Sequence, residues 1–404
     1  MSYRVWVIGL DGATFDLIEP WVKAGLLPTF ARLLKEGCWG DIRSTIPPIT
    51  GPAWSSFMTG TNPGSHAIFD WVHRRPGSYD FPPVTGEHCR QPSLWQIASL
   101  AGKRVLVLNV PMTYPPETVN GMVVAGLPST TLSTYPQSLT EEIKKLIPDY
   151  VVYPDPGQAY SDQGIDAFLT RLEKSNAGLM ALWRELINRE MWDFAMLVFN
   201  ATDVVQHAMW RFMSPAHPRY DAEKAKRYGD AILNIYKEMD RILGEMIASI
   251  DHETTLLLMS DHGFGPFHKF IHVNTWLRKE GLLSIQSSPK ARIKSTLFRM
   301  GLSPMPIYEM MMRFGLGRFK REVVRGKGQG LLRTFFLSFD DVDWGKTVAY
   351  SLGNIGQIRI NLKGREPRGI VRASLALRRA RRQGRRCVAG HPARAACRWT
   401  RAEE

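Results

Sequence analysis

Cysteine is scarce in this chain, and long apolar runs are missing. The 404 residues include four cysteines, and no two of them form a CxxC pair. A disulfide scaffold needs a higher cysteine density in a shorter chain, so we expect reduced thiols. No apolar stretch reaches the roughly 18 residues of a membrane-spanning helix, and the first residues, MSYRVWVIGLDG, lack the basic and apolar regions of a signal peptide. The sequence therefore predicts a cytoplasmic protein without a membrane span.

Acidic residues are outnumbered by basic ones, and the excess is unevenly distributed. The formal net charge is +14, of which residues 370–404 contribute +8 through ten Arg, no Lys and two Glu. The rest of the chain carries only +6. Because most of the basicity lies in this tail, the charge gives little support to a specific nucleic-acid partner. The alternative function, from a different functional class, is that of a basic protein that binds nucleic acid.

Hydrophobic residues make up 44% of the chain, which is enough for a large core, and they follow two kinds of pattern. Continuous apolar runs of strand length occupy residues 5–10, 105–110, 194–199 and 254–260. Amphipathic segments of helical period occupy residues 26–36, 165–189 and 222–250. Continuous apolar strands separated by helices are typical of parallel sheets. The alternation predicts an α/β fold with a doubly wound, mostly parallel sheet flanked by helices.

Composition divides the chain into four parts. Residues 1–284 are predicted to form the α/β core. Residues 285–345 are basic and rich in Met and Phe, and they predict a helical insert. This insert is a cap over the active site, an element that contacts a partner or a membrane surface, or a solvated insertion. Residues 346–369 return to a strand-rich pattern assigned to the core sheet, and residues 370–404 form a tail.

Acidic side chains follow three of the predicted strands. Asp11 and Asp261 come directly after the first and the last apolar run, and Asp203 comes shortly after the third. The carboxyl ends of parallel strands meet at one edge of a sheet, where such folds bind ligands. Carboxylates gathered there repel each other unless cations neutralise them, so the sequence predicts a metal site.

Two pairs of residues have the spacing of metal ligands. Asp203 and His207 are four residues apart, so a helix would place both on one face. That spacing is weak evidence alone, because an N-cap Asp with a surface His has the same pattern. Asp261 and His262 precede Gly263, and a tight turn there would let both side chains reach one ion. Mixed carboxylate and imidazole ligands suit Zn²⁺, with Mn²⁺ as the alternative.

Thr50 is the candidate nucleophile. It follows Pro47 and Pro48 and precedes a short predicted helix over residues 52–59, so its hydroxyl would lie at a helix N-terminus that favours anions. The alternative is an ordinary Thr N-cap. A threonine hydroxyl needs a lowered pKa to attack, which a coordinated metal supplies. With one ion activating Thr50 and another binding the phosphoryl oxygen, these residues describe phosphoryl transfer through a phospho-threonine.

Four segments carry a family resemblance in combination. They are GLDGATFD (9–16), PPITGPAWSSFMTGTNPGSHAIFDW (47–71), NATDVVQHAMW (200–210) and SDHGFGP (260–266). In this order they resemble the type I phosphodiesterase / nucleotide pyrophosphatase family of the alkaline phosphatase superfamily. The resemblance extends to about residue 370 and implies a metal-dependent hydrolase of a small phosphate ester or a nucleotide-like substrate. A phosphomonoesterase or a mutase-like relative is the alternative within the superfamily.

The resemblance also implies how the ligands are shared between two divalent ions. The ligands of one ion would be Asp11, Thr50, Asp261 and His262, and those of the other Asp203 and His207. The family has a third ligand for this second ion, a histidine near the C-terminus. Here only His391 follows His272, and its surroundings do not resemble the family motif. His268 and His272 are expected to be supporting or surface groups.

A second departure from the family concerns the phosphoryl oxygen. Relatives that cleave nucleotide diesters carry an Asn about 21 residues after the nucleophile, whereas the same count from Thr50 leads to Trp71. Loss of that donor would weaken oxyanion stabilisation, which places nucleotide pyrophosphatase activity in doubt but not the two-metal chemistry. An aromatic side chain there would instead shape the substrate pocket.

The composition changes abruptly just past residue 370, toward Arg, Ala, Gly, Pro, Cys and Trp. A frameshifted reading of a GC-rich gene would produce this bias, and a disordered basic tail or an Arg-rich nucleic-acid arm are the alternatives. If the segment is frameshifted, the last metal ligand is lost, and we expect weak binding of the second ion and slow or no hydrolysis. A catalytically impaired protein that keeps the fold is then the competing interpretation.

Overall fold

The computed structural model describes residues 4–160, 164–300, 337–353 and 355–372. The chain divides into two compact units. We call Met1–His73 with Pro83–Lys269 the core unit, and Arg74–Pro82 with Phe270–Glu404 the second unit. Residues 301–336 of the predicted insert and residues 373–404 of the predicted tail lie outside the described residues.

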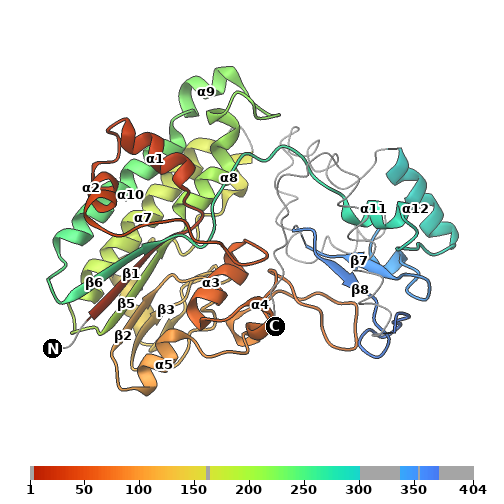
Figure 1. The fold of residues 1–404 in the computed structure, drawn as a ribbon, viewed down its shortest axis with the longest axis horizontal. Helices are drawn as coiled ribbons and strands as arrows, with labels where there is room; N and C mark the ends of the chain where they lie inside the picture. The colour runs from red at the N-terminus through yellow and green to blue at the C-terminus, as the bar shows by residue number, and fades with distance from the viewer. Residues whose placement is uncertain (1–3, 161–163, 301–336, 354, 373–404) are drawn as a thin grey trace. The chain divides into compact units, whose positions relative to one another are not determined.

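The core unit is built on a six-stranded sheet with the strand order β4-β3-β2-β5-β1-β6 (Figure 1). The strands are β1 (Arg4–Leu10), β2 (Val105–Leu108), β3 (Gly121–Val124), β4 (Thr134–Tyr135), β5 (Phe194–Phe199) and β6 (Thr254–Met259). All pairings are parallel except that of β3 with β4. The predicted α/β fold with a mostly parallel sheet is confirmed. The apolar pattern misses β3 because it begins with Gly121 and has only three apolar residues, and it misses β4 because that strand has two residues.

Helices occupy the connections between the strands. Those of the core unit are α1 (Phe15–Lys23), α2 (Pro28–Glu36), α3 (Thr50–Thr59), α4 (Pro63–His66), α5 (Leu94–Leu100), α6 (Leu139–Leu146), α7 (Ile165–Ile187), α8 (Ala201–Met213), α9 (Ala222–Tyr228) and α10 (Ala231–Ala248), with 3₁₀ turns at Gly86–His88 and Pro156–Tyr160. The helix predicted over residues 222–250 is divided in two, because α9 ends at Gly229 and α10 begins after its N-cap residue, Asp230. Glycine and aspartate are both unfavourable inside a helix.

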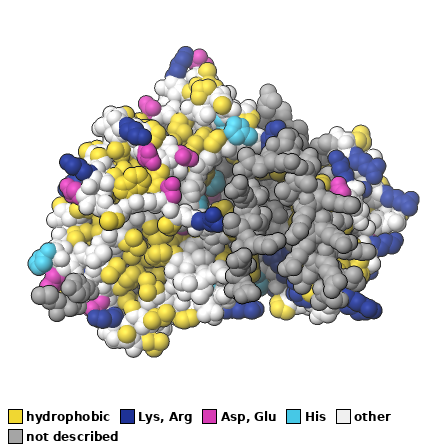
Figure 2. All heavy atoms as spheres, viewed as in Figure 1, with side chains coloured by type: hydrophobic (Ala, Val, Ile, Leu, Met, Phe, Trp, Pro, Cys, Tyr) yellow, Lys and Arg dark blue, Asp and Glu magenta, His cyan; other side chains and the backbone are white. Residues whose placement is uncertain are grey.

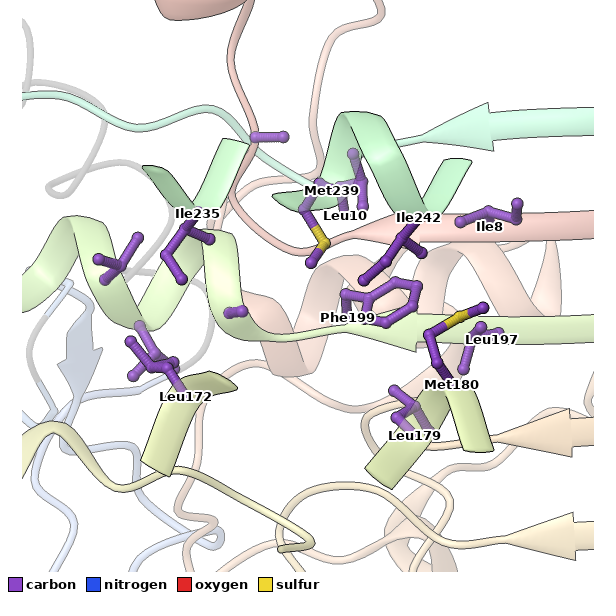
Figure 3. Close-up of a cluster of buried hydrophobic side chains, with 14 of the residues drawn as sticks. Ile8, Leu10, Leu172, Leu179, Met180, Leu197, Phe199, Ile235, Met239 and Ile242 are labelled. Atoms are coloured by element: carbon purple, nitrogen blue, oxygen red, sulfur yellow. The ribbon is translucent and has the colours of Figure 1, made fainter. Parts of the chain in front are cut away.

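Two buried hydrophobic clusters cover the two faces of the sheet. Alternate residues of β1 point to opposite faces, Ile8 and Leu10 to one cluster and Val7 to the other. Figure 3 shows part of the first cluster, formed by Ile8, Leu10, Leu197 and Phe199 of the strands with Leu172, Leu179 and Met180 of α7 and Ile235, Met239 and Ile242 of α10. On the other face, Trp54 of α3 and Trp95 of α5 are fully buried. Burial of each large apolar side chain contributes roughly 1.5–3 kcal/mol, so the sheet is a rigid base for the residues at its edge.

The second unit contains α11 (Val273–Lys279), α12 (Pro289–Arg299), a 3₁₀ turn at Phe339–Asp341 and the strands β7 (Ala349–Ser351) and β8 (Ile358–Ile360). β7 and β8 form an antiparallel sheet of their own, so they do not extend the core sheet as the sequence predicts for residues 346–369. Residues 270–284 also belong to this unit, where the sequence assigns them to the core. The reason is that Leu277 and Leu283 are buried in a separate cluster with Trp344 and Tyr350.

Charged side chains are mixed on the visible surface of the core unit. Figure 2 shows Lys and Arg interspersed with Asp and Glu and with apolar side chains on this face. None of the helices in the described part of the chain is both long and apolar enough to cross a membrane.

Candidate active site

Carboxylates and an imidazole meet at the carboxyl ends of three neighbouring strands. β5, β1 and β6 are adjacent in the sheet. Asp11 follows β1, Asp261 lies just after β6, and Asp203 lies in the first turn of α8, which follows β5. Ligand atoms of Asp11, Asp203 and His262 all lie within 4.8 Å of one another. The structure thus brings residues from distant parts of the chain together at one edge of the sheet.

The Thr50 hydroxyl adds to this set of atoms. Thr50 Oγ1 lies 3.4 Å from Asp11 Oδ1 and 3.3 Å from His262 Nε2. His262 Nε2 in turn lies 3.5 Å from Asp11 Oδ1 and 3.4 Å from Asp261 Oδ2. Donors at the usual Zn–O and Zn–N distances around one tetrahedral ion are roughly 3.3–3.4 Å apart. These separations, long for direct hydrogen bonds, therefore fit ligands of a shared cation.

A backbone carbonyl fixes the orientation of His262. Its Nδ1 lies 2.9 Å from Gly263 O. Since a carbonyl oxygen only accepts, Nδ1 carries the proton and donates, and Nε2 keeps its lone pair toward Thr50 and Asp11. Imidazoles that bind metals commonly donate their other N–H to a carbonyl in this way.

Burial and mutual repulsion disfavour negative charge on the carboxylates. Burial, then Asp261 and Asp203, raises the pKa of Asp11 well above its usual range, although Trp54 Nε1 donates a hydrogen bond to Asp11 Oδ2 at 3.2 Å. Burial raises the pKa of Asp261 to about 6 against an opposing electrostatic effect of His262. Asp203 Oδ1 and Asp261 Oδ2 accept no hydrogen bond from the described residues. Divalent cations would neutralise this cluster and coordinate those oxygens, so the donor set fits them.

Asp203 and His207 lie one turn apart on the same face of α8. Asp203 Oδ1 and His207 Nε2 face each other at 3.4 Å. Asn200 is the N-cap residue of this helix, so Asp203 does not have the N-cap role that its spacing also allowed. The His207 side chain is half exposed, and its ring packs edge-on against Phe264 with the centroids 4.7 Å apart. The pair is therefore free to contribute ligands to a second cation.

Thr50 is the first residue of α3, so the helix starts two residues before the predicted start at Pro52. Ile49 is the N-cap residue, and no side chain caps this helix. The structure therefore excludes the N-cap role for Thr50. The hydroxyl faces Asp11 and His262 instead, and the first N–H groups of α3 have no partner within the helix. Such a helix start attracts anions such as a phosphoryl group.

Groups that the sequence analysis does not identify hold the ligands in place. Three hydrogen bonds do so, from Thr202 Oγ1 to Asp11 O (2.6 Å), from Gln206 Nε2 to Gly12 O (2.8 Å) and from Ser44 Oγ to Asp261 O (2.6 Å). Gly12 has a φ of +67°, and a Cβ there would lie 3.0 Å from Asp203 Oδ1. Both the backbone conformation and the close approach require glycine. The position of Gly12 directly after Asp11, in the segment GLDG, is the one sequence signal that could have indicated these supporting contacts.

A serine–histidine pair elsewhere in α3 and α4 does not form a nucleophilic dyad. Ser56 Oγ lies 3.0 Å from His66 Nε2. Ile68 N–H donates to His66 Nδ1 at 3.1 Å, so Nε2 carries the ring proton and cannot accept the proton of Ser56. Ser56 in turn donates to Thr45 Oγ1 at 3.2 Å. The pair therefore anchors the segment that leads to Thr50.

The type I phosphodiesterase / nucleotide pyrophosphatase family model matches residues 5–312. The chain belongs to this family. No curated protein sequence matches it significantly. Among solved structures, phosphonoacetate hydrolase from Sinorhizobium meliloti is similar at 20% identity and a TM-score of 0.46, over 69% of this chain and 62% of that chain. Murine ectonucleotide pyrophosphatase / phosphodiesterase 5 is similar at 14% identity and a TM-score of 0.43, over 71% and 64%. The chain spans less than two thirds of the length of these two structures.

The match to the type I phosphodiesterase / nucleotide pyrophosphatase family confirms the resemblance that the four sequence segments carry. Two departures from the family pattern have a place in the structure. Trp71, which the sequence analysis compares with a family Asn, lies beside Gly51 of α3. His268 is exposed, with its ring 6.4 Å from that of His217. His272 is the N-cap residue of α11 in the second unit, and its side chain does not cap the helix.

Within the described ranges, Asp11, Asp203 and His262 make up the one group of three or more ligand-type side chains. No third histidine or acidic residue of those ranges joins Asp203 and His207 in such a group. His391 lies outside the described residues.

Proposed function

We propose that the chain is a divalent-metal-dependent phosphoester hydrolase that forms a covalent intermediate on Thr50. The position of Thr50 Oγ1 carries this proposal, because it lies at the N-terminus of α3, 3.3 Å from His262 Nε2 and 3.4 Å from Asp11 Oδ1. A hydroxyl that caps no helix and faces ligand-type atoms supports a nucleophilic role for Thr50. Small phosphodiesters are the proposed substrates, and phosphomonoesters are the second candidate.

Two sets of residues would hold the cations. One ion would be held by Asp11, Thr50, Asp261 and His262, and the other by Asp203 and His207. Bound Zn²⁺, or Mn²⁺, would neutralise the carboxylates, lower the pKa of the Thr50 hydroxyl and attract the phosphoryl oxygens. The hydrogen bonds from Trp54 to Asp11 and from Gly12 N–H to Asp261 would keep the ligands oriented.

The chain's own groups define a two-step reaction. Thr50 loses its proton to solvent and Oγ1 attacks phosphorus, so that a P–Oγ1 bond forms while the bond from phosphorus to the leaving oxygen breaks. The leaving oxygen takes up a proton from solvent. Water then attacks the same phosphorus and loses a proton, while the P–Oγ1 bond breaks and Oγ1 takes up a proton to restore the Thr50 hydroxyl. Through both steps, the N–H groups at the start of α3 stabilise the negative phosphoryl oxygens.

The occupancy of the second cation site decides between an active hydrolase and a competing proposal. Asp203 and His207 are its two described ligands, so we expect this ion to bind more weakly than the first. A catalytically impaired protein that keeps the fold and one ion is the alternative function. Elemental analysis after dialysis against Zn²⁺ separates the two, since about two ions per chain are expected for the active hydrolase and one for the impaired protein.

Hydrolysis assays test the proposed function directly. The Zn²⁺-loaded protein should hydrolyse bis(p-nitrophenyl) phosphate, and a chelator should abolish turnover that added Zn²⁺ or Mn²⁺ restores. Thr50→Ala should lose this turnover, while Thr50→Ser, which keeps a hydroxyl at the same place, should retain part of it. Turnover by Thr50→Ala at the wild-type rate would contradict the proposal.

A further inference from the structure

The imidazole of His207 has few polar contacts that could orient it. Its side chain is 54% exposed, and its Nε2 lies 3.4 Å from Asp203 Oδ1, which is long for a hydrogen bond. The other ring of the site, His262, is 11% exposed and donates from Nδ1 to Gly263 O. Within the described ranges, no such hydrogen bond fixes Nδ1 of His207. A histidine that binds a metal is usually oriented through its other ring nitrogen, so His207 needs a different support.

An aromatic side chain contacts this imidazole directly. The rings of Phe264 and His207 meet edge to face, with their centroids 4.7 Å apart and an angle of 82° between their planes. Phe264 also stacks on Trp210, with the centroids 5.5 Å apart and 19° between the planes. Trp210 is 8% exposed and belongs to the hydrophobic cluster that α7, α8 and α10 form on one face of the sheet. Phe264 therefore connects an exposed imidazole to a closely packed core.

The backbone that leads to Phe264 is held by hydrogen bonds that do not involve its ring. Ser44 Oγ donates to Asp261 O at 2.6 Å. Ser260 Oγ donates to His262 O at 2.7 Å. The ring thus extends from a segment that is already ordered. Because these hydrogen bonds survive when the ring is removed, Asp261 and His262 should keep their positions without it.

We infer that Phe264 is a positioning residue, which holds the His207 imidazole in the orientation that the second cation requires. The inference rests on the proposed function, because it takes Asp203 and His207 as ligands of that ion. An exposed imidazole moves among several rotamers, and only those that direct Nε2 toward Asp203 let both side chains bind one ion. The contact with Phe264 favours such a rotamer before the ion arrives, so less side-chain entropy is lost on binding.

Cation affinities test the inference without any turnover. Metal-free protein is titrated with Zn²⁺ in competition with a chelating dye, which gives the affinity for each ion. Phe264→Ala should bind the second ion about 3–10-fold more weakly than the wild type and the first ion equally well. Phe264→Tyr, which keeps a ring at this place, should restore most of the lost affinity. An unchanged affinity for the second ion in Phe264→Ala, or an equal loss for both ions, would overturn the inference.

NMR on the metal-free protein measures the orientation itself. The three-bond couplings of the His207 Cβ protons should show one χ1 rotamer in the wild type and averaged rotamers in Phe264→Ala. Averaged rotamers in the wild type as well would overturn the inference. If the wild type binds two ions but hydrolyses no phosphoester, the proposed function fails, and the affinities and couplings still decide the inference. If no second ion binds at saturating Zn²⁺, the inference fails, whereas hydrolysis with one ion would leave the role of Thr50 standing.

Discussion

Replacing Gly12 by alanine tests whether the position of Asp203 controls the site. Gly12 has a φ of +67°, and the new Cβ would lie 3.0 Å from Asp203 Oδ1 and 3.2 Å from the Asp203 Cα. The left-handed conformation costs a non-glycine residue roughly 1–2 kcal/mol. Crowding against the backbone of α8 adds roughly 1–3 kcal/mol, since the Asp203 Cα cannot rotate away. Gly12→Ala should therefore lower the free energy of unfolding by roughly 2–5 kcal/mol and displace the Asp203 carboxylate.

Gly25 provides the matched control. Its φ is +73°, but a Cβ there would meet nothing within 4 Å. Gly25→Ala should thus lose only the roughly 1–2 kcal/mol of the backbone conformation. Guanidinium unfolding measures both losses, and titration with Zn²⁺ against a chelating dye measures cation affinity. We expect weaker cation binding and slower diester hydrolysis in Gly12→Ala alone. Equal stability losses in the two variants, with equal cation affinity, would refute the reasoning.

Three further predictions concern individual groups of the site. Thr50→Ala should lower kcat for diester hydrolysis by about 10³ or more, because it removes the nucleophile. The Zn²⁺ content should not fall, because the other ligands remain. Steady-state kinetics measures kcat, and elemental analysis measures the Zn²⁺ content. Asp203→Asn combined with His207→Ala should remove the more weakly bound ion, so equilibrium dialysis should show one fewer Zn²⁺ per chain than the wild type. Asp261 has a pKa of about 6 in the folded state, above its value in the unfolded chain, so the folded state binds this proton more tightly. The free energy of unfolding of the cation-free protein should therefore fall as the pH rises from about 4 through 6. Asp261→Asn or saturating Zn²⁺ should flatten that decline in unfolding free energy, and a decline of the same slope in all three samples would count against the site.

The centre of the parallel core was predictable because strands such as β2 and β5 are buried on both faces. A run such as FAMLVF has no polar residue to mark an exposed side, and β5 has the predicted bounds, Phe194–Phe199. The convergence of Asp11, Asp203 and Asp261 follows from the same topology, since parallel strands end at one edge. The amphipathic pattern over residues 222–250 predicts one helix where the structure has two. The break at Gly229 was not evident because apolar residues keep nearly the same helical spacing before and after it.

The support of the site was not predictable from the sequence. Thr202 and Gln206 reach the backbone of the β1 turn only because α8 packs across the end of β1, which is a tertiary contact without a local signal. The same holds for Trp54, whose bond to Asp11 depends on where α3 crosses the sheet. The division into units was missed for a similar reason, since Leu277 has the same apolar pattern whichever hydrophobic cluster it joins.

Trapping the covalent intermediate tests the central claim most directly. Zn²⁺-loaded protein is mixed with methyl p-nitrophenyl phosphate, quenched in acid during turnover and mapped by tandem mass spectrometry. A methylphosphoryl group on Thr50, absent from Thr50→Ala, is the predicted result. Steady release of p-nitrophenolate with no modified residue, or with the group on a residue other than Thr50, would contradict the account.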